Sequence, residues 1–229
     1  MFLNHLIDKL HDSIHHHETA LNYLKGRKVT DEVIKTFKLG YSRVVAAGDD
    51  GSEDYKNFNE ETYRGKALEN KLIFPIYDML GNPAGILGRA IDSKKFILYL
   101  TLESKFMGAF FGLPQALPFI YETGRVFTVE GPFDFLAFRK VYPNVVGTLT
   151  AELTEAQHDL LSLYAKEIIT VFDSDVPGRK AAERAEKFSN VKTISLGFKD
   201  PDGVLKYYNN FDEYTRYVKR KVGEILWMK

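Results

Sequence analysis

Apolar residues recur at helical spacing near the start of the chain. The residues with this spacing would lie on one side of a helix, and they are Leu3, Leu6, Ile7, Leu10 and Ile14. The pattern predicts an amphipathic helix there and a second helix over residues 20–25. A third helix is expected to run from Thr30, whose hydroxyl can cap it, to Gly40.

The next pattern is typical of strands. Residues 72–77 form an apolar run, and the turn sequence Gly-Asn-Pro at 81–83 separates it from a second run at 84–88. We expect a β-hairpin here, which would make the first part of the chain α+β. The polar, Gly- and Asp-rich stretch at 47–59 predicts an exposed loop before it.

The pattern of apolar and polar residues changes after about residue 121. Short apolar runs, which predict strands, lie at 125–129, 145–147, 167–172 and 191–196. Between them lie segments of helical period, at 133–141, 154–164 and 177–188, and a last helical segment spans 206–228. Strands that alternate with helices predict an α/β fold with a mostly parallel central sheet.

Composition narrows the function classes. The chain has 229 residues, 45% of them apolar, which is enough to build a core. It has no Cys, which excludes disulfides, thiol nucleophiles and cysteine-based zinc or iron–sulfur sites. No apolar run approaches the ~20 residues of a membrane span, so we expect no membrane partner and a cytoplasmic protein. Equal numbers of acidic and basic residues, 31 each, predict no global affinity for polyanions.

Carboxylates follow three of the predicted parallel strands. Glu130 and Asp134 come after the first strand, Asp173 and Asp175 after the third, and Asp200 and Asp202 after the fourth. Because ligands bind at the carboxyl ends of strands in open α/β sheets, these acids are expected to meet at one edge. Crowded carboxylates repel one another unless a cation neutralises them, and hard oxygen ligands favour Mg²⁺ or Mn²⁺. The sequence therefore predicts a divalent-metal site.

These motifs resemble a known family. VEGPFDFLA, VFDSDVPGRKAA and KDPDGVLK are similar to the three sequence blocks of the TOPRIM fold as bacterial DnaG-type primases carry it. Upstream, ALNYLKGRKVTDEVIKTFKLGY and KLIFPIYDMLGNPAGILGRAI resemble the N-terminal half of that family's RNA polymerase core. The resemblance covers nearly the whole chain. It implies three parts: an α+β N-terminal subdomain at 1–120 with a basic groove, a TOPRIM metal-binding subdomain at 121–205, and a C-terminal helical segment at 206–229.

The resemblance also implies roles for single residues. The family's metal-binding acids fall on Glu130, Asp173, Asp175, Asp200 and Asp202, with Glu130, Asp173 and Asp175 as the catalytic set and Asp134 as a supporting acid. The basic residues that line the family's template and nucleotide groove fall on Arg27, Arg89 and Lys95, with Lys94 as an alternative to Lys95, and a fourth falls within about one position of Lys105. Two segments depart from the family. KKFILYLTLESK stands where members read KYLNSPET, and LTAELT stands where they read LGTALT. Both changes bear on nucleotide placement rather than on metal binding.

The implied activity is synthesis of short RNA primers from NTPs on a single-stranded DNA template, with Mg²⁺ or Mn²⁺ as cofactor. The family's zinc-binding domain has no counterpart in this sequence, so a replicative helicase or a separate zinc-domain protein is an expected partner. A bacterial cytoplasm, or that of a phage-infected host, is the expected location. Two alternatives stay open at this point: a TOPRIM nuclease, and a non-catalytic module that binds DNA or the replisome and depends on another subunit.

Overall fold

A computed structural model describes residues 2–43, 66–93, 95–150, 152–172, 175–185, 187–198, 200–208 and 210–226. Among the predicted site residues, Lys94 and Asp173 lie outside these ranges, and so does the loop expected at 47–59. The chain divides into two compact units, residues 1–106 and 107–229. No helix among the described residues is long and apolar enough to cross a membrane.

The first unit is built on an antiparallel sheet. Its strands β1 (Gly40–Ser42), β2 (Lys71–Tyr77), β3 (Pro83–Ala90) and β4 (Phe96–Leu100) follow one another in the order of the sequence. The expected hairpin is β2–β3, and its turn is closed by Asp78, whose carboxylate accepts from the backbone of Leu80 and Asn82 at 2.8 Å each. The hairpin prediction is therefore confirmed, with β2 and β3 slightly longer than expected.

The opening helix α1 (Phe2–Ile14) covers one face of this sheet. Its apolar stripe packs on side chains of β2, β3 and β4, and this core cluster includes Leu6, Ile7, Ile73, Ile86 and Tyr99. The amphipathic helix predicted from the sequence is therefore confirmed, and its apolar side is the side that is buried. This burial stabilises the fold, because each Å² of apolar area removed from water contributes about 25 cal/mol.

Shorter helices complete the first unit. They are α2 (Glu18–Gly26), α3 (Asp31–Thr36), the 3₁₀ turn η1 (Lys66–Leu68) and α5 (Leu102–Met107), which ends one residue into the second unit. Thr30 caps α3 as expected, accepting from the Val33 N–H at 3.4 Å. The helix ends at Thr36 rather than Gly40, because Gly40 begins β1. A Cβ on Gly40 would lie 2.7 Å from the backbone of Leu10, so only glycine allows this approach to α1.

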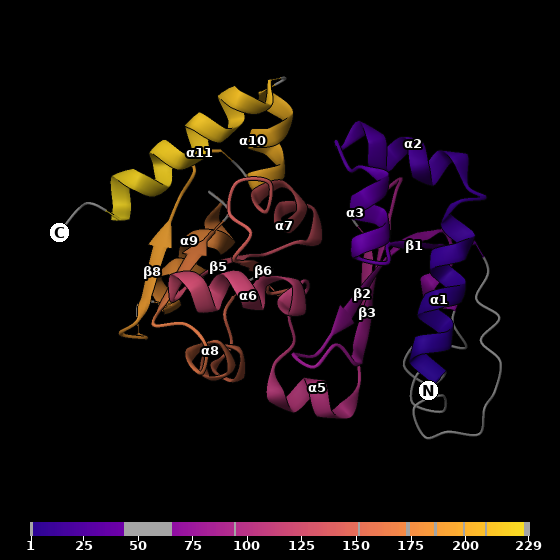
Figure 1. The fold of residues 1–229 in the computed structure, drawn as a ribbon, viewed down its shortest axis with the longest axis horizontal. Helices are drawn as coiled ribbons and strands as arrows, with labels where there is room; N and C mark the ends of the chain where they lie inside the picture. Colours follow the sequence, from indigo (N-terminus) through magenta and orange to yellow (C-terminus); the bar gives the residue numbers. More distant parts are fainter. Residues whose placement is uncertain are drawn as a thin grey trace. The chain divides into compact units, whose positions relative to one another are not determined.

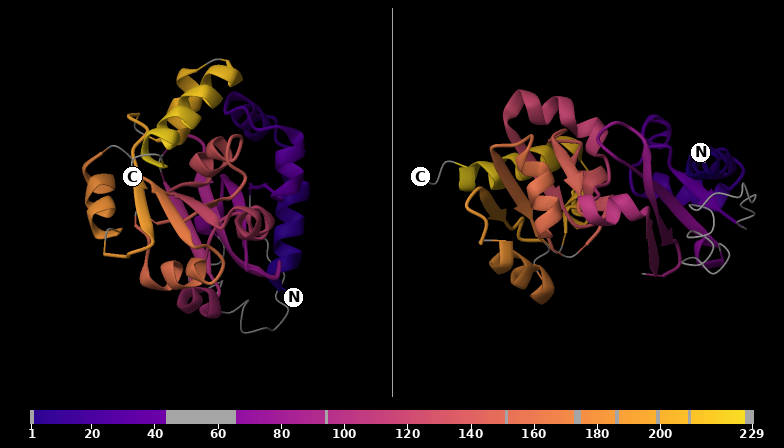
Figure 2. Two further views of the ribbon diagram at one scale, coloured as in Figure 1. Left: turned by 60° about the vertical axis from the view of Figure 1, so that its left-hand side comes forward. Right: turned by 90° about the horizontal axis from the view of Figure 1, so that it is seen from below.

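The second unit holds a four-stranded parallel sheet. Its strands are β5 (Arg125–Val129), β6 (Val145–Gly147), β7 (Glu167–Val171) and β8 (Val191–Ile194), in the order β6-β5-β7-β8. The helices α6 (Leu113–Thr123), α7 (Pro132–Phe138), α8 (Glu155–Ser162) and α9 (Val176–Ala185) pack against it. Figure 2 shows these strands with helices on both faces of the sheet, which confirms the predicted α/β class.

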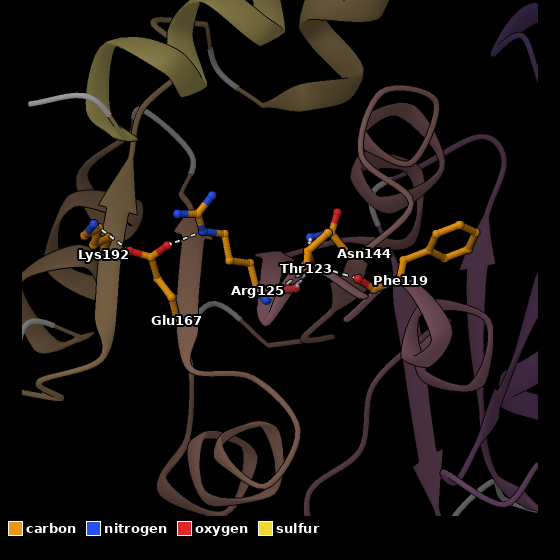
Figure 3. Close-up of polar contacts among 6 residues, drawn as sticks. All are labelled: Phe119, Thr123, Arg125, Asn144, Glu167 and Lys192. Carbon is orange, nitrogen blue, oxygen red and sulfur yellow. Dashed lines mark hydrogen bonds and ion pairs between the residues drawn. The ribbon is translucent and has the colours of Figure 1, made fainter. Parts of the chain in front are cut away.

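The amino end of this sheet is tied by polar contacts (Figure 3). Glu167 of β7 bonds Arg125 of β5 at 2.7 Å and Lys192 of β8 at 2.5 Å, so one carboxylate joins three neighbouring strands. Burial alone would raise the pKa of Glu167, but the two cations outweigh it and lower the pKa from 4.5. Beside it, the amide of Asn144 donates to Thr123 at 3.2 Å.

The chain ends in two helices rather than the single one expected over 206–228. They are α10 (Pro201–Tyr207) and α11 (Phe211–Leu226), which lie next to α7 in Figure 1. The single-helix prediction is wrong because α10 begins before this segment and a cap at Asn210 starts a new helix within it. Asp200 caps α10, and Asn210 accepts from the Asp212 N–H at 2.8 Å where α11 begins. Tyr208 between them is extended (φ −85°, ψ 105°).

Candidate functional site

The carboxyl ends of the parallel strands are in register. Val129 of β5 pairs with Val171 of β7, which in turn pairs with Ile194 of β8. Because the strands are parallel, everything that follows these three residues leaves the sheet at the same edge. This is the edge at which the acidic positions were expected.

The first acidic segment makes a tight turn from β5 into α7. Glu130 follows the strand directly, and its side chain is exposed. Gly131 caps α7, and Asp134 lies in the first turn of that helix. A Cβ on Gly131 would lie 2.7 Å from the Asp134 carboxylate. The Asp134 carboxylate therefore folds back against the main chain of Gly131, and a side chain at position 131 would displace it.

The third acidic segment begins α10 and touches the first. The Asp200 carboxylate caps the helix and accepts from the Gly203 N–H at 2.6 Å. Asp134 accepts from the backbone N–H of Asp202 at 3.2 Å, across 68 residues of sequence. The structure thus brings Asp134 and Asp202 together, as the edge-of-sheet argument predicts.

The side chain of Asp202 is nearly buried, with 7% of the residue exposed, and bonds the Lys206 ammonium at 2.6 Å. A buried carboxylate is costly without such a partner. Sequence reasoning did not single out Lys206. The signal that could have found it is its position four residues after Asp202 on a helix.

The charges of Asp134 and Asp202 also act on a tyrosine of α11. Tyr214 is fully buried and donates its hydroxyl to the Ala137 carbonyl of α7 at 2.8 Å. Its pKa is raised chiefly by burial and further by the negative charges of Asp134 and Asp202. The two carboxylates therefore set a negative potential between α7, α10 and α11.

The second acidic segment is described only in part, since Asp173 lies outside the described residues. Asp175 is exposed and accepts from the Gly178 N–H at 3.0 Å at the start of α9. Phe172, which precedes Asp173, lines one small cavity together with Glu130. The end of β7 is therefore next to the end of β5, so the second segment begins beside the first.

The donors at this edge fit a divalent cation by their chemistry, because carboxylate oxygens are the ligands that Mg²⁺ and Mn²⁺ prefer. In the described part of the chain, no three Asp, Glu or His side chains are grouped closely enough to hold a metal ion. Several of these acids instead cap helices or bind Lys206 in this structure.

The predicted basic residues all lie in the first unit. Arg89 is on β3 and is paired with Phe96 of β4, and the N–H of Ala90, next in the chain, donates to the Lys95 carbonyl at 2.9 Å. Arg27 caps α2 and donates to the Tyr23 hydroxyl at 2.7 Å, while Lys105 is exposed on α5. The structure therefore places Arg89 and Lys95 on adjoining backbone segments, where β3 meets the start of β4, and leaves Arg27 and Lys105 on other elements.

Comparison with known proteins places the two units in one family. Residues 8–106 match the family model described as "DNA primase catalytic core, N-terminal domain", and residues 127–205 match the model described as "Toprim-like". The DNA primase of Aquifex aeolicus is 32% identical over 200 residues, which cover 80% of this chain and 40% of that protein. This chain thus spans about two fifths of that relative's length.

Solved structures agree with these matches. The crystal structure of the Aquifex aeolicus primase, with its zinc-binding and RNA polymerase domains, is 27% identical and has a TM-score of 0.76. The match covers 97% of this chain and 59% of that one. A DnaG primase catalytic domain bound to single-stranded DNA has the same fold, with a TM-score of 0.77 at 21% identity over 95% of this chain and 79% of that one. The chain therefore belongs with the DnaG-type primases and carries the catalytic-core N-terminal domain followed by the Toprim-like domain.

Proposed function

We propose that this chain is a primase catalytic core that synthesises short RNA primers from NTPs on single-stranded DNA. The observation that carries the proposal is the combination of the two family domains in one order with acids at one edge of the parallel sheet. The matches do not favour a Toprim nuclease or a non-catalytic module.

The cofactor class is a divalent metal, and we assign Mg²⁺ or Mn²⁺ to it. Glu130, Asp173, Asp175, Asp200 and Asp202 are the residues that would hold it. When bound, the metal would neutralise the charge of the triphosphate and lower the pKa of the attacking hydroxyl. Phosphoryl transfer needs alignment and charge neutralisation rather than covalent help from the protein.

The chain's own residues have distinct parts in this reaction. The primer 3′-oxygen forms a bond to the α-phosphorus of the incoming NTP while the bond to the β-phosphate bridging oxygen breaks, and pyrophosphate leaves. We assign to Glu130, which is exposed at the end of β5, the acceptance of the proton of the hydroxyl. Asp134 supports the site by holding the main chain of Asp202.

Substrate and template would be held by cations. We assign Arg89 and Lys95, with Arg27 and Lys105 (and Lys94 as the alternative to Lys95), to charge neutralisation of the template strand or the triphosphate. The solved relative bound to single-stranded DNA supports a template of that kind. A replicative helicase or a zinc-domain protein is the partner we propose.

The test is primer synthesis by the purified chain on single-stranded DNA with NTPs and Mg²⁺ or Mn²⁺, with and without an added helicase or zinc-domain protein. Asp175→Ala is expected to lower the rate at least about 100-fold, since even supporting partners of a metal site contribute 10–100-fold. Asp159→Asn on α8 is the matched control, because that carboxylate is 79% exposed and lies outside the acidic edge.

Full activity of Asp175→Ala would contradict the role of the acidic edge. Cleavage of nucleic acid without incorporation of NTPs would instead indicate a nuclease.

A further inference from the structure

Four aromatic rings gather where the chain leaves the sheet for its last helices. Phe198 follows β8, Tyr207 ends α10, Tyr208 comes directly after it, and Tyr217 lies on α11. The Phe198 ring centroid lies 5.1 Å from that of Tyr207 and 5.5 Å from that of Tyr217, and Tyr208 lies 5.1 Å from Tyr207 and 5.3 Å from Tyr217. We call these four residues the aromatic platform.

The platform is a surface feature rather than part of the core. None of its four residues is buried, and Tyr207 is 68% exposed. The Tyr217 ring is held in place because its hydroxyl donates a hydrogen bond to the Leu196 carbonyl. The rings are thus held in place while part of their faces and edges stays accessible, and such exposed apolar clusters mark binding sites.

A cation-rich segment of α11 carries one of the platform's rings. Tyr217 lies within the segment 216–221, Arg-Tyr-Val-Lys-Arg-Lys, which holds four cations and no acid. The Arg220 guanidinium lies 5.4 Å from the Tyr217 ring centroid. Glu224 pairs with Arg220 at 3.6 Å and with Lys221 at 3.1 Å, so one acid is shared by two of these four cations. The surface next to the rings therefore suits a polyanion.

A groove in the second unit is lined by residues of α9, β8 and the segments next to them. It has a volume of about 350 Å³, and Gly197, Ser195, Arg179, Gly178 and Phe172 are among its lining residues. A Cβ on Gly197 would lie 3.4 Å from the Tyr217 hydroxyl, and the Gly178 N–H is bonded to Asp175. The lining of the groove therefore includes a neighbour of the platform and a neighbour of the second acidic segment.

We infer that the aromatic platform stacks unpaired bases of a single-stranded DNA, whose backbone lies along the cations of α11. Aromatic rings bind bases of any sequence because every base has a π-face, and neighbouring cations hold the phosphates. α10 has seven residues and is about 10 Å long, so a base on the platform lies one or two nucleotides from the acids that begin that helix. The inference rests on the proposed function for the identity of the strand, the DNA template.

The experiment measures binding without catalysis. Fluorescence anisotropy with a labelled oligo(dT) of about ten nucleotides, in EDTA and about 50 mM salt, reports the affinity of the whole chain. Tyr207→Ala is expected to weaken binding about 5- to 150-fold, the effect of losing one stacked base. Tyr121→Ala is the matched control, because Tyr121 on α6 is 66% exposed and its ring packs against that of Tyr164, outside the platform. It is expected to bind as the wild type does.

An abasic oligonucleotide of the same length separates stacking from charge. The platform predicts that Tyr207→Ala leaves the affinity for this probe unchanged, because the probe has phosphates but no bases. Equal loss with both probes, equal binding of oligo(dT) by variant and wild type, or no binding by the wild type would overturn the inference. A loss seen with oligo(rU) but not with oligo(dT) would overturn the assignment to the template strand. Since EDTA removes the metal, failure of primer synthesis leaves this result intact, and the two proposals can fail separately.

Discussion

A buried amide on α8 holds the turn that supports the Glu130 segment, and its removal gives the sharpest stability prediction. Gln157 is 4% exposed. Its Nε2 donates to the carbonyls of Ala109 at 2.9 Å and Thr148 at 2.8 Å, and its Oε1 accepts from the Thr154 N–H at 3.2 Å. Leu149, next in the chain, donates its N–H to the Glu130 carbonyl at 3.0 Å. Gln157→Ala therefore loosens a turn that contacts the acidic edge.

The magnitude follows from these three bonds. Each hydrogen bond contributes about 1 kcal/mol net, which gives about 3 kcal/mol. Ala109 and Thr148 are both buried, at 8% and 4% exposure, so their carbonyls cannot replace the amide with bulk water. We therefore expect Gln157→Ala to lower the free energy of unfolding by about 3 to 5 kcal/mol, a large part of a typical domain's stability.

Urea unfolding followed by far-UV circular dichroism measures this loss. With a slope of about 2 kcal/mol per M, the midpoint is expected to fall by about 2 M at an unchanged slope. Asp159→Asn on the same helix is the control and is expected to stay within about 0.5 kcal/mol of the wild type. A Gln157→Ala loss below about 1 kcal/mol would refute the reasoning, because it would mean that these carbonyls find other partners.

Two further predictions concern pH. The Tyr77 hydroxyl is buried without a hydrogen-bond partner among the described residues, and burial, with a smaller contribution from the charge of Asp8, raises its pKa to about 12. The raised pKa means that its stability contribution is present below the unfolded value of about 10 and is lost as pH rises towards 12. Tyr77→Phe should thus be as stable as the wild type at pH 7 and lose less stability as the pH rises, which thermal unfolding at several pH values measures. If the variant lost as much stability at alkaline pH as the wild type, the role of Tyr77 would be contradicted. Glu167, whose pKa is lowered, contributes stability above pH 4.5 that is lost as pH falls. Because its partners Arg125 and Lys192 are half exposed, Glu167→Gln should cost only about 1 kcal/mol at pH 7, and acid titration of the variant should show a shallower loss. If the Glu167→Gln variant lost stability below pH 4.5 as steeply as the wild type does, this role would be refuted.

Periodicity predicted most of the fold. The four parallel strands and the β2–β3 hairpin were predictable because apolar runs bounded by Gly, Pro and Asn are typical of buried strands. β1 was missed because three residues are too few to show a period. β4 was missed because its exposed Phe96 and preceding lysines resemble a basic loop. The wrong single helix at 206–228 came from overlooking Asn210, whose side chain accepts from the Asp212 N–H where α11 begins.

The candidate site was predictable in outline only. Sequence order places acids after strands, and parallel topology then brings them to one edge. The contact of Asp134 with the Asp202 N–H spans 68 residues and depends on how α7 and α10 pack, which no local pattern encodes. The domain boundaries at 120 and 205 and the metal-binding roles of the acids stay predictions.

The strand order of the second unit also has a consequence during synthesis. β5 is an inner strand of the sheet. β8, the last strand to be added, ends 65 residues after β5 in the chain. At about 5 to 20 residues per second, a ribosome needs roughly 3 to 13 seconds to deliver that stretch. During the last 23 residues of that stretch, after Val171 completes β7, the open edge of β7 is free to pair with other nascent chains. Coexpressed chaperones that cover exposed strand edges should therefore raise the recovery of this protein.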